Sequence, residues 1–193
     1  MHPILMVILI TVLVVAFALY MARVRRDSAN ADDGIHESRI GERLRRLNEN
    51  KEKYAVMTPD LLAETPDDAL LEAVLSGLWA KMEPDLSNAA EVMAGQSQGR
   101  QRMYALYSVT GDVKQDGFDA LKASSDAQFI PMAQAALEAL GMEGSRALLE
   151  DALHSEDAGA YDDAYVETFT GEAGKEKMTA YIRENAREFC DLA

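Results

Sequence analysis

The apolar residues of this chain follow two patterns, one continuous and one periodic. The stretch "PILMVILITVLVVAFALYMA", residues 3–22, contains no charged residue. About twenty apolar residues in a helix match the roughly 30 Å hydrocarbon core of a bilayer. We therefore predict a single transmembrane helix over residues 3–22, with the lipid bilayer as its partner. After this stretch the apolar residues recur at helical spacing.

The flanks of this stretch predict its orientation. Arg23, Arg25 and Arg26 follow it directly, and the side richer in Lys and Arg stays in the cytoplasm. We expect a single-pass protein of the cell inner membrane with its soluble domain in the cytoplasm. A cleaved signal peptide is the alternative, because residues 16–18 read Ala-Phe-Ala. No Lys or Arg precedes the apolar run, which continues past Ala18, so the anchor is favoured.

Residues 23–58 are predicted to form a polar linker and a charged juxtamembrane helix. The linker, "RRDSANADDG", is rich in Asp, Asn, Ser and Gly. Ile40, Leu44 and Leu47 then share one helical face among charged residues. Such a helix can rest on anionic lipid, pack on the domain or form a short coiled coil. The interspersed acids favour the last two readings.

The periodic pattern of residues 59–193 predicts an all-α domain. In "TPDDALLEAVLSGLWAKM", Thr65 is in the position to cap a helix whose first turn contains Pro66 and two acids. Leu71, Val74, Leu78 and Trp79 form its apolar stripe. Further stripes include Met103, Leu106, Phe129, Ala133, Leu137, Leu140, Leu148, Leu149, Leu153, Met178, Tyr181, Ile182 and Phe189. No segment shows the sustained alternation of a strand.

The segment "DVKQDGFDALKA", residues 112–123, has part of the pattern of a calcium-binding loop. Asp112, Asp116 and Gly117 occupy the first, fifth and sixth positions of such a loop. Lys114 and Ala123 occupy the third and twelfth positions, where oxygen ligands are needed. We therefore predict no metal site here. The segment is better explained as a structural turn at Gly117 that directs Phe118 inward.

Charge is distributed unevenly along the chain. The formal net charge is −14; residues 23–53 contain nine Lys and Arg against seven Asp and Glu, which leaves −16 for residues 54–193. Such a domain repels phosphate backbones, so we predict no direct nucleic-acid binding. A basic protein is the favoured partner. The predicted partner-binding acids are Glu150, Asp151, Glu156, Asp157, Asp162, Asp163 and Glu167; a solvated surface that aids solubility is the alternative.

No catalytic, metal or cofactor-binding residues are predicted. The histidines are His2, His36 and His154, and none belongs to a metalloprotease motif. No nucleophile elbow, phosphate-binding loop or dinucleotide fingerprint occurs. The only cysteine, Cys190, excludes an intramolecular disulfide and is expected to be a small buried apolar residue. We therefore expect a protein without enzymatic activity.

Several segments together resemble a known family. They are "RMYALYSVTGDVKQDGFDALKASS", "AQAALEALGMEGSRALLEDAL", "YDDAYVETF" and "MTAYIRENAREF". This arrangement, over roughly residues 70–189, resembles the small helical bacterial domains named after a DNA-mimic protein. The matching positions are Tyr104 or Tyr107, the turn Gly117–Phe118, Gly141, residues 181–185 and Phe189; Gln115, Asp116 and Ala120 depart from the family's turn.

This resemblance implies an all-α fold and, through the family's name, a protein that presents carboxylates in place of phosphates. The combined expectation is a membrane-anchored, non-enzymatic acidic module that binds a basic cytosolic protein, by DNA mimicry of a DNA-binding protein. The alternative is a structural or adaptor subunit of a membrane protein complex, with contacts made by the anchor and the Ile40–Leu47 helix. Assembly into a homo-oligomer stays open.

Overall fold

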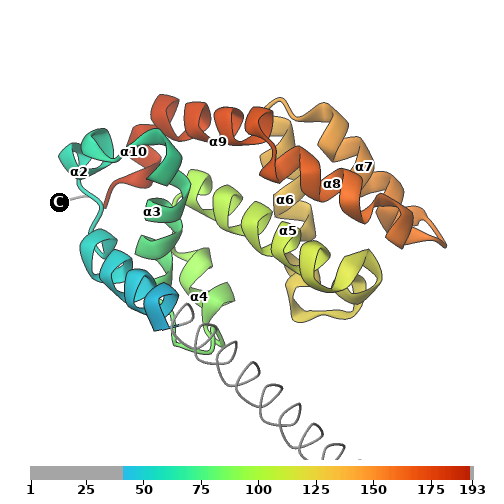
Figure 1. Cartoon of the computed structure of the whole chain (residues 1–193), viewed down its shortest axis with the longest axis horizontal. Helices are drawn as coiled ribbons and strands as arrows, with labels where there is room; N and C mark the ends of the chain where they lie inside the picture. The colour runs from blue at the N-terminus through green and yellow to red at the C-terminus, as the bar shows by residue number, and fades with distance from the viewer. Residues whose placement is uncertain (1–40, 192–193) are drawn as a thin grey trace, which may run out of the picture. The chain divides into compact units, whose positions relative to one another are not determined.

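The computed structural model describes residues 41–191, which form helices joined by short turns (Figure 1). No strand occurs in this range, so the all-α prediction is confirmed. The transmembrane helix predicted for residues 3–22 and the linker up to residue 40 lie outside the described residues. Between residues 41 and 191, no helix is long and apolar enough to cross a membrane.

The chain divides into two units, residues 1–48 and 49–193. Residues 41–54 are helical, in agreement with the charged helix predicted there. The elements of the second unit are α2 (Pro59–Glu64), α3 (Asp67–Trp79), α4 (Ala89–Ala94), α5 (Gln98–Ala123), the 3-10 helix η1 (Ser125–Phe129), α6 (Ile130–Ala139), α7 (Glu143–His154), the 3-10 helix η2 (Ala158–Tyr161), α8 (Asp162–Thr170), α9 (Glu172–Glu184) and α10 (Ala186–Phe189).

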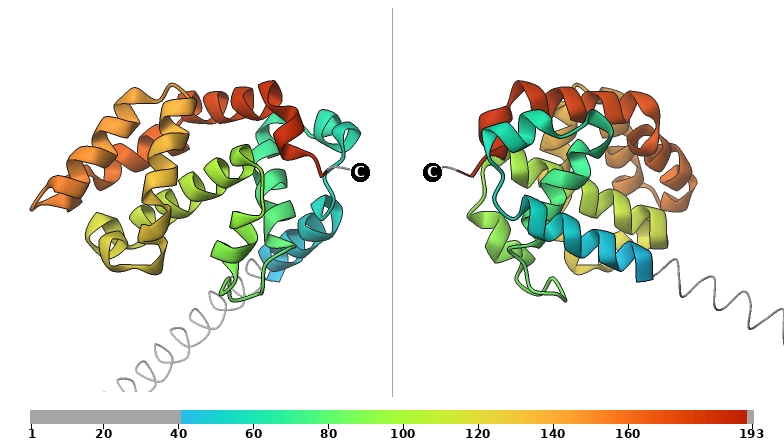
Figure 2. Two further views of the ribbon diagram at one scale, coloured as in Figure 1. Left: turned by 180° about the vertical axis from the view of Figure 1, so that it is seen from behind. Right: turned by 60° about the vertical axis from the view of Figure 1, so that its left-hand side comes forward.

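Helix α5 is the centre of the second unit. It packs against α3, α6, α8 and α10, and the views in Figure 2 show these helices around it. Leu106, Val109 and Leu121 on α5 have no accessible surface. Leu106 and Val109 are three residues apart, which keeps both on the inward side of the helix because 3.6 residues make one turn; Leu121 lies beyond the interruption at Gly117. The sequence pattern placed Met103 and Leu106 of this helix in the core, and both are buried.

The start of α3 differs from the prediction. Its N-cap is Pro66, and no side chain caps it. The Thr65 hydroxyl instead donates to the carbonyl of Leu61 at 2.7 Å and closes the preceding helix α2. The predicted capping role of Thr65 is therefore wrong, because its hydroxyl bonds back to the carbonyl four residues earlier and makes no bond to the first N–H groups of α3. Thr58 is the threonine that caps, accepting from Leu61 N–H at 3.1 Å.

The end of α6 confirms the role predicted for Gly141. Gly141 has φ of +62°, which favours glycine. The Met142 N–H donates to Leu137 O at 2.8 Å, and the Gly141 N–H donates to Glu138 O at 3.0 Å. These two bonds form a Schellman motif, in which a left-handed residue ends the helix. Met142 and Leu137 are both buried beside it.

The C-terminal end of the described chain is fastened to residues from three other segments. Asp191 Oδ1 accepts from Lys81 at 2.5 Å and from Arg100 at 2.7 Å, and Oδ2 accepts from the Met57 N–H at 2.7 Å. Burial alone would raise the pKa of Asp191, but the hydrogen bonds from Arg100, Lys81 and Met57 outweigh it and lower the pKa below its ordinary value. Neighbouring Cys190 lies half-buried just after α10, where burial raises the pKa of its thiol.

Candidate binding surface

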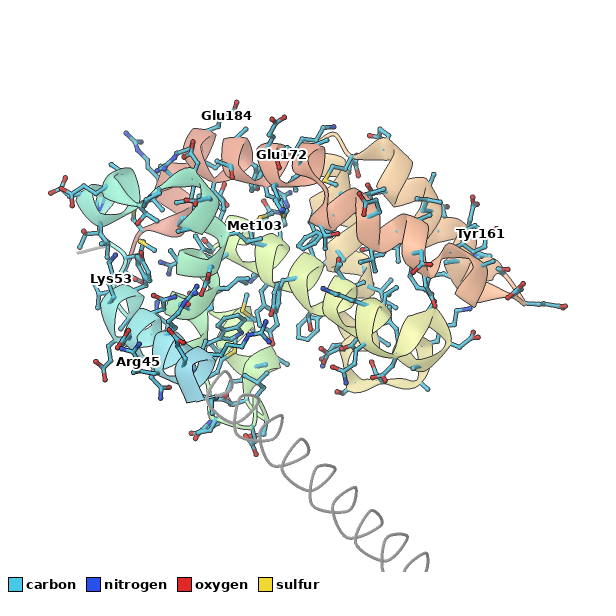
Figure 3. All side chains as sticks on the ribbon, viewed as in Figure 1. Arg45, Lys53, Met103, Tyr161, Glu172 and Glu184 are labelled. Atoms are coloured by element: carbon cyan, nitrogen blue, oxygen red, sulfur yellow. The ribbon has the colours of Figure 1, made fainter. Side chains whose placement is uncertain are left out.

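The acids predicted to bind a partner lie on three consecutive segments. Glu150 and Asp151 are on α7, Glu156 and Asp157 are in the following turn, and Asp162, Asp163 and Glu167 are on α8. Helix α7 packs against η2 and α8, so the fold brings these segments together. Figure 3 labels Tyr161 at the end of η2, far from Lys53 at the opposite end of the domain.

Helix geometry explains why these acids are exposed. On α7, Leu149 and Ala152 are fully buried, which leaves Glu150 and Asp151 outside. On α8, Tyr165 is the buried residue, and Asp163 and Glu167 face solvent. Residues four apart on a helix are neighbours, with about 5–6 Å between their Cβ atoms. Asp163 and Glu167 therefore form one short line of negative charge.

We define the acidic surface as Glu150, Asp151, Glu156, Asp157, Asp163 and Glu167, all of them exposed. None of these carboxylates has a hydrogen-bond or ion-pair partner within residues 41–191. Many cations of the domain contact other groups: Lys81 and Arg100 bind Asp191, Lys122 binds Asp119, Arg146 binds Glu143 and Arg183 binds Asp67. The cations nearest the acidic surface, Arg146 and Lys122, are thus engaged elsewhere, Arg146 with Glu143 and Lys122 with Asp119 and the Ser155 carbonyl, and the six carboxylates stay without a direct partner.

Asp162 differs from the other predicted acids, because it is half-buried and has a structural contact. Its Oδ1 accepts from the Phe118 N–H at 3.1 Å. Its Oδ2 would lie 2.7 Å from a Cβ atom at Gly117, so a side chain there would collide with it. Asp162 therefore connects the start of α8 to the turn in α5.

The turn predicted at Gly117 is confirmed. Gly117 has φ of 81° and ψ of 170° and interrupts α5, a conformation essentially restricted to glycine. The next residue, Phe118, is fully buried, as is Leu121. The ring centroids of Phe118 and of Tyr165 on α8 are 5.2 Å apart. This turn therefore positions the acidic helix α8 through one hydrogen bond and one aromatic contact.

The segment that resembles a calcium loop contributes to a different feature. Asp112 and Asp116 line a cavity of about 300 Å³ with Asp126 from η1, a third acid that the sequence pattern did not indicate. Burial, and then the charges of Asp126 and Asp116, raise the pKa of Asp112, while the hydrogen bond from Ser124 opposes the shift. Within the described part of the chain, no group of three His, Cys, Asp or Glu side chains could hold a metal ion.

His154 lies at the exposed end of α7. Its Nδ1 is 2.7 Å from the carbonyl oxygen of Glu150. This contact is made to the preceding turn of the same helix.

Comparison with known proteins agrees with this arrangement. The family model described as "DMP19-like protein" matches residues 94–192, which is 99 of the 193 residues. No curated protein matches the chain, and no solved structure does. The matched range contains the turn at Gly117, the helix end at Gly141 and the whole acidic surface. The resemblance to DNA-mimic domains is thereby confirmed, and the chain belongs to the DMP19-like family.

Proposed function

We propose that this protein is a non-enzymatic binding module that captures a basic DNA-binding protein on its acidic surface. The observation that carries the proposal is the set of six exposed carboxylates on α7, the following turn and α8 that have no hydrogen-bond or ion-pair partner among the described residues. Membership of the DMP19-like family, named for a DNA mimic, supports a role in protein interaction.

The density of charge on packed helices supports mimicry of a phosphate backbone. One DNA strand presents a phosphate about every 3.4 Å along its axis. Acids four residues apart on one helix are separated by about 6 Å of rise. Asp163 and Glu167 on α8 have this interval, and Glu150 and Asp151 on the packed helix α7 add two further carboxylates beside them. A protein surface built for phosphates would find carboxylates at a comparable interval.

The proposal includes the membrane anchor. A helix over residues 3–22 would hold the module against the inner membrane, with the acidic surface in the cytoplasm. Such a tether would raise the local concentration of the module at the membrane and would recruit the DNA-binding protein there. The apolar run without charge and the arginines after it support this part of the proposal.

Neutralising selected carboxylates tests the proposal. The variant Glu150→Gln/Asp151→Asn/Asp163→Asn/Glu167→Gln removes four negative charges from the acidic surface. The matched control Asp60→Asn/Glu64→Gln/Glu91→Gln/Glu184→Gln removes four exposed charges from α2, α4 and α9. The full chain is crosslinked in native membranes at low salt, and captured proteins are identified by mass spectrometry.

We expect wild type and control to capture a basic DNA-binding protein and the acidic-surface variant to lose it. Capture should weaken steeply with salt, because exposed charges are screened over a Debye length of about 10 Å at 0.1 M. If both variants lose capture equally, only net charge matters. If the acidic-surface variant captures as much as wild type, the acidic surface does not bind the partner. Capture of no basic protein at low salt would refute the proposed function.

A further inference from the structure

A groove of about 770 Å³ lies between α3 and α9, apart from the acidic surface. Its volume is within the range of roughly 300–1,000 Å³ that is usual for ligand sites. The lining includes Leu71 on α3 and Met178 and Ala180 on α9, which form an apolar floor. Figure 3 labels Glu172 and Glu184 at the two ends of α9.

Acids surround this apolar floor. Asp68 on α3 and Glu172 and Glu176 on α9 line the groove and are exposed. These three carboxylates have no hydrogen-bond or ion-pair partner within the described range. The lining as a whole contains five acids and two bases, which gives a net charge of −3.

Arg183 is one of the two bases, and its guanidinium is already engaged. It donates to Leu62 O and Thr65 O at 2.6 Å each and pairs with Asp67 at 2.7 Å. Its charge is therefore used to hold α2 and α3 against α9. The remaining cation, Lys175, is exposed on the side of α9. An anionic ligand would thus meet more carboxylates than available cations.

The apolar floor and the acidic rim together determine which class of ligand the groove can bind. An apolar floor favours a ligand with apolar side chains, because their burial removes apolar surface from water. A negative rim favours Lys or Arg beside those side chains. A second copy of this chain, with a net charge of −14, would be repelled, as would anionic lipid or nucleic acid. We propose that the α3–α9 groove binds a cationic amphipathic peptide segment, and this inference rests on the proposed function because the segment belongs to the captured protein.

Two synthetic peptides test the inference on the purified full chain. One is a peptide of about four helical turns, or about 14 residues, with Leu and Lys on opposite helical faces. The other has Ser in place of each Leu and the same number of Lys. Binding is measured by fluorescence anisotropy at fixed salt. We expect the Leu/Lys peptide to bind at least about tenfold more tightly than the Ser/Lys peptide. Charge alone cannot produce this difference, because both peptides contain the same number of Lys.

A substitution within the groove locates the site. Ala180→Arg places a long cationic side chain on the exposed side of α9, where it fills the groove. Ala90→Arg adds the same charge at an exposed position of α4, outside the groove, and serves as the matched control. We expect Ala180→Arg to weaken binding of the Leu/Lys peptide about tenfold and Ala90→Arg to weaken it less than about threefold. Circular dichroism checks that both variants keep their helices.

Three results would overturn the inference: equal binding of the two peptides, equal effects of the two substitutions, or a self-associated wild type that Ala180→Arg dissociates in sedimentation. The last result would assign the groove to a second copy. The variant lacking the four acidic-surface charges separates this inference from the proposed function. If it still captures the DNA-binding protein while Ala180→Arg blocks the peptide, the proposed function fails and the groove remains a peptide site.

Discussion

The turn at Gly117 provides a quantitative test of how the acidic helix α8 is held in place. Gly117 has φ of 81° and ψ of 170°, and residues other than glycine pay on the order of 1–3 kcal/mol in that region. A Cβ atom there would also lie 2.7 Å from Oδ2 of Asp162. The carboxylate would have to move, although its Oδ1 accepts from the Phe118 N–H at 3.1 Å.

The two costs of Gly117→Ala can be added to a first approximation. Backbone strain contributes about 2 kcal/mol, and the weakened hydrogen bond of a half-buried carboxylate contributes about 1 kcal/mol. We therefore expect a loss of about 3 kcal/mol in the free energy of unfolding, which is large beside the total of about 5–15 kcal/mol. The measurement is urea unfolding of the full chain followed by far-ultraviolet circular dichroism.

The same helix offers a control for the same substitution. Gly111 is exposed on α5, and a Cβ atom there would meet nothing within 4 Å. Gly111→Ala should therefore stabilise the protein by about 0.5–1 kcal/mol, because alanine restricts the unfolded chain and favours a helix. If both substitutions change stability by the same amount and sign, the assigned role of Gly117 is wrong.

A double-mutant cycle separates the collision from the backbone strain. In an Asp162→Ala background the carboxylate that a Cβ atom would displace is absent. Gly117→Ala should then cost about 1 kcal/mol less than in wild type, because residues in contact have non-additive effects. Additive effects would mean that Asp162 does not limit the space at Gly117.

Two further predictions concern the contacts that fasten the ends of the domain. Arg183→Ala should destabilise by about 2 kcal/mol, because the carbonyls of Leu62 and Thr65 lose charged donors; Asp67→Asn should cost below about 1 kcal/mol, because Asp67 is exposed. Equal losses in urea unfolding would contradict this ranking. The lowered pKa of Asp191 means that its stabilisation is present above the unfolded-state pKa of about 3.9 and is lost as pH falls below it. The stability difference between wild type and Asp191→Asn should therefore shrink between pH 5 and pH 2, and a constant difference would refute the assignment.

Local features of the fold could be predicted from the sequence because they depend on neighbouring residues. The helical periods located the buried residues of α5, α6 and α9. Gly117 and Gly141 were recognisable because each follows a helical pattern that a left-handed residue can interrupt or end. Thr65 shows the limit of this reasoning. Both Thr58 and Thr65 precede a proline, and only packing determines that Thr58 caps a helix while Thr65 closes one.

Contacts between distant residues were not predictable from spacing. Asp162 was counted among the surface acids, but its partner Phe118 lies 44 residues earlier in the chain. The bond between Asp191 and Met57 joins residues 134 apart. The α3–α9 groove likewise combines residues that are about 100 positions apart in the sequence, so no local pattern indicates it. The acidic surface was predictable as a run of charge, whereas only the structure shows that its six carboxylates have no direct hydrogen-bond or ion-pair partner among residues 41–191.

Competition with DNA tests the central claim, that the acidic surface takes the place of a phosphate backbone. A labelled DNA duplex is bound to the captured basic protein, and the complex is titrated with the full chain while the anisotropy of the DNA is recorded. We expect wild type to release the duplex and the variant Glu150→Gln/Asp151→Asn/Asp163→Asn/Glu167→Gln to leave it bound. A stable complex that contains the duplex, the basic protein and this chain together would contradict the claim.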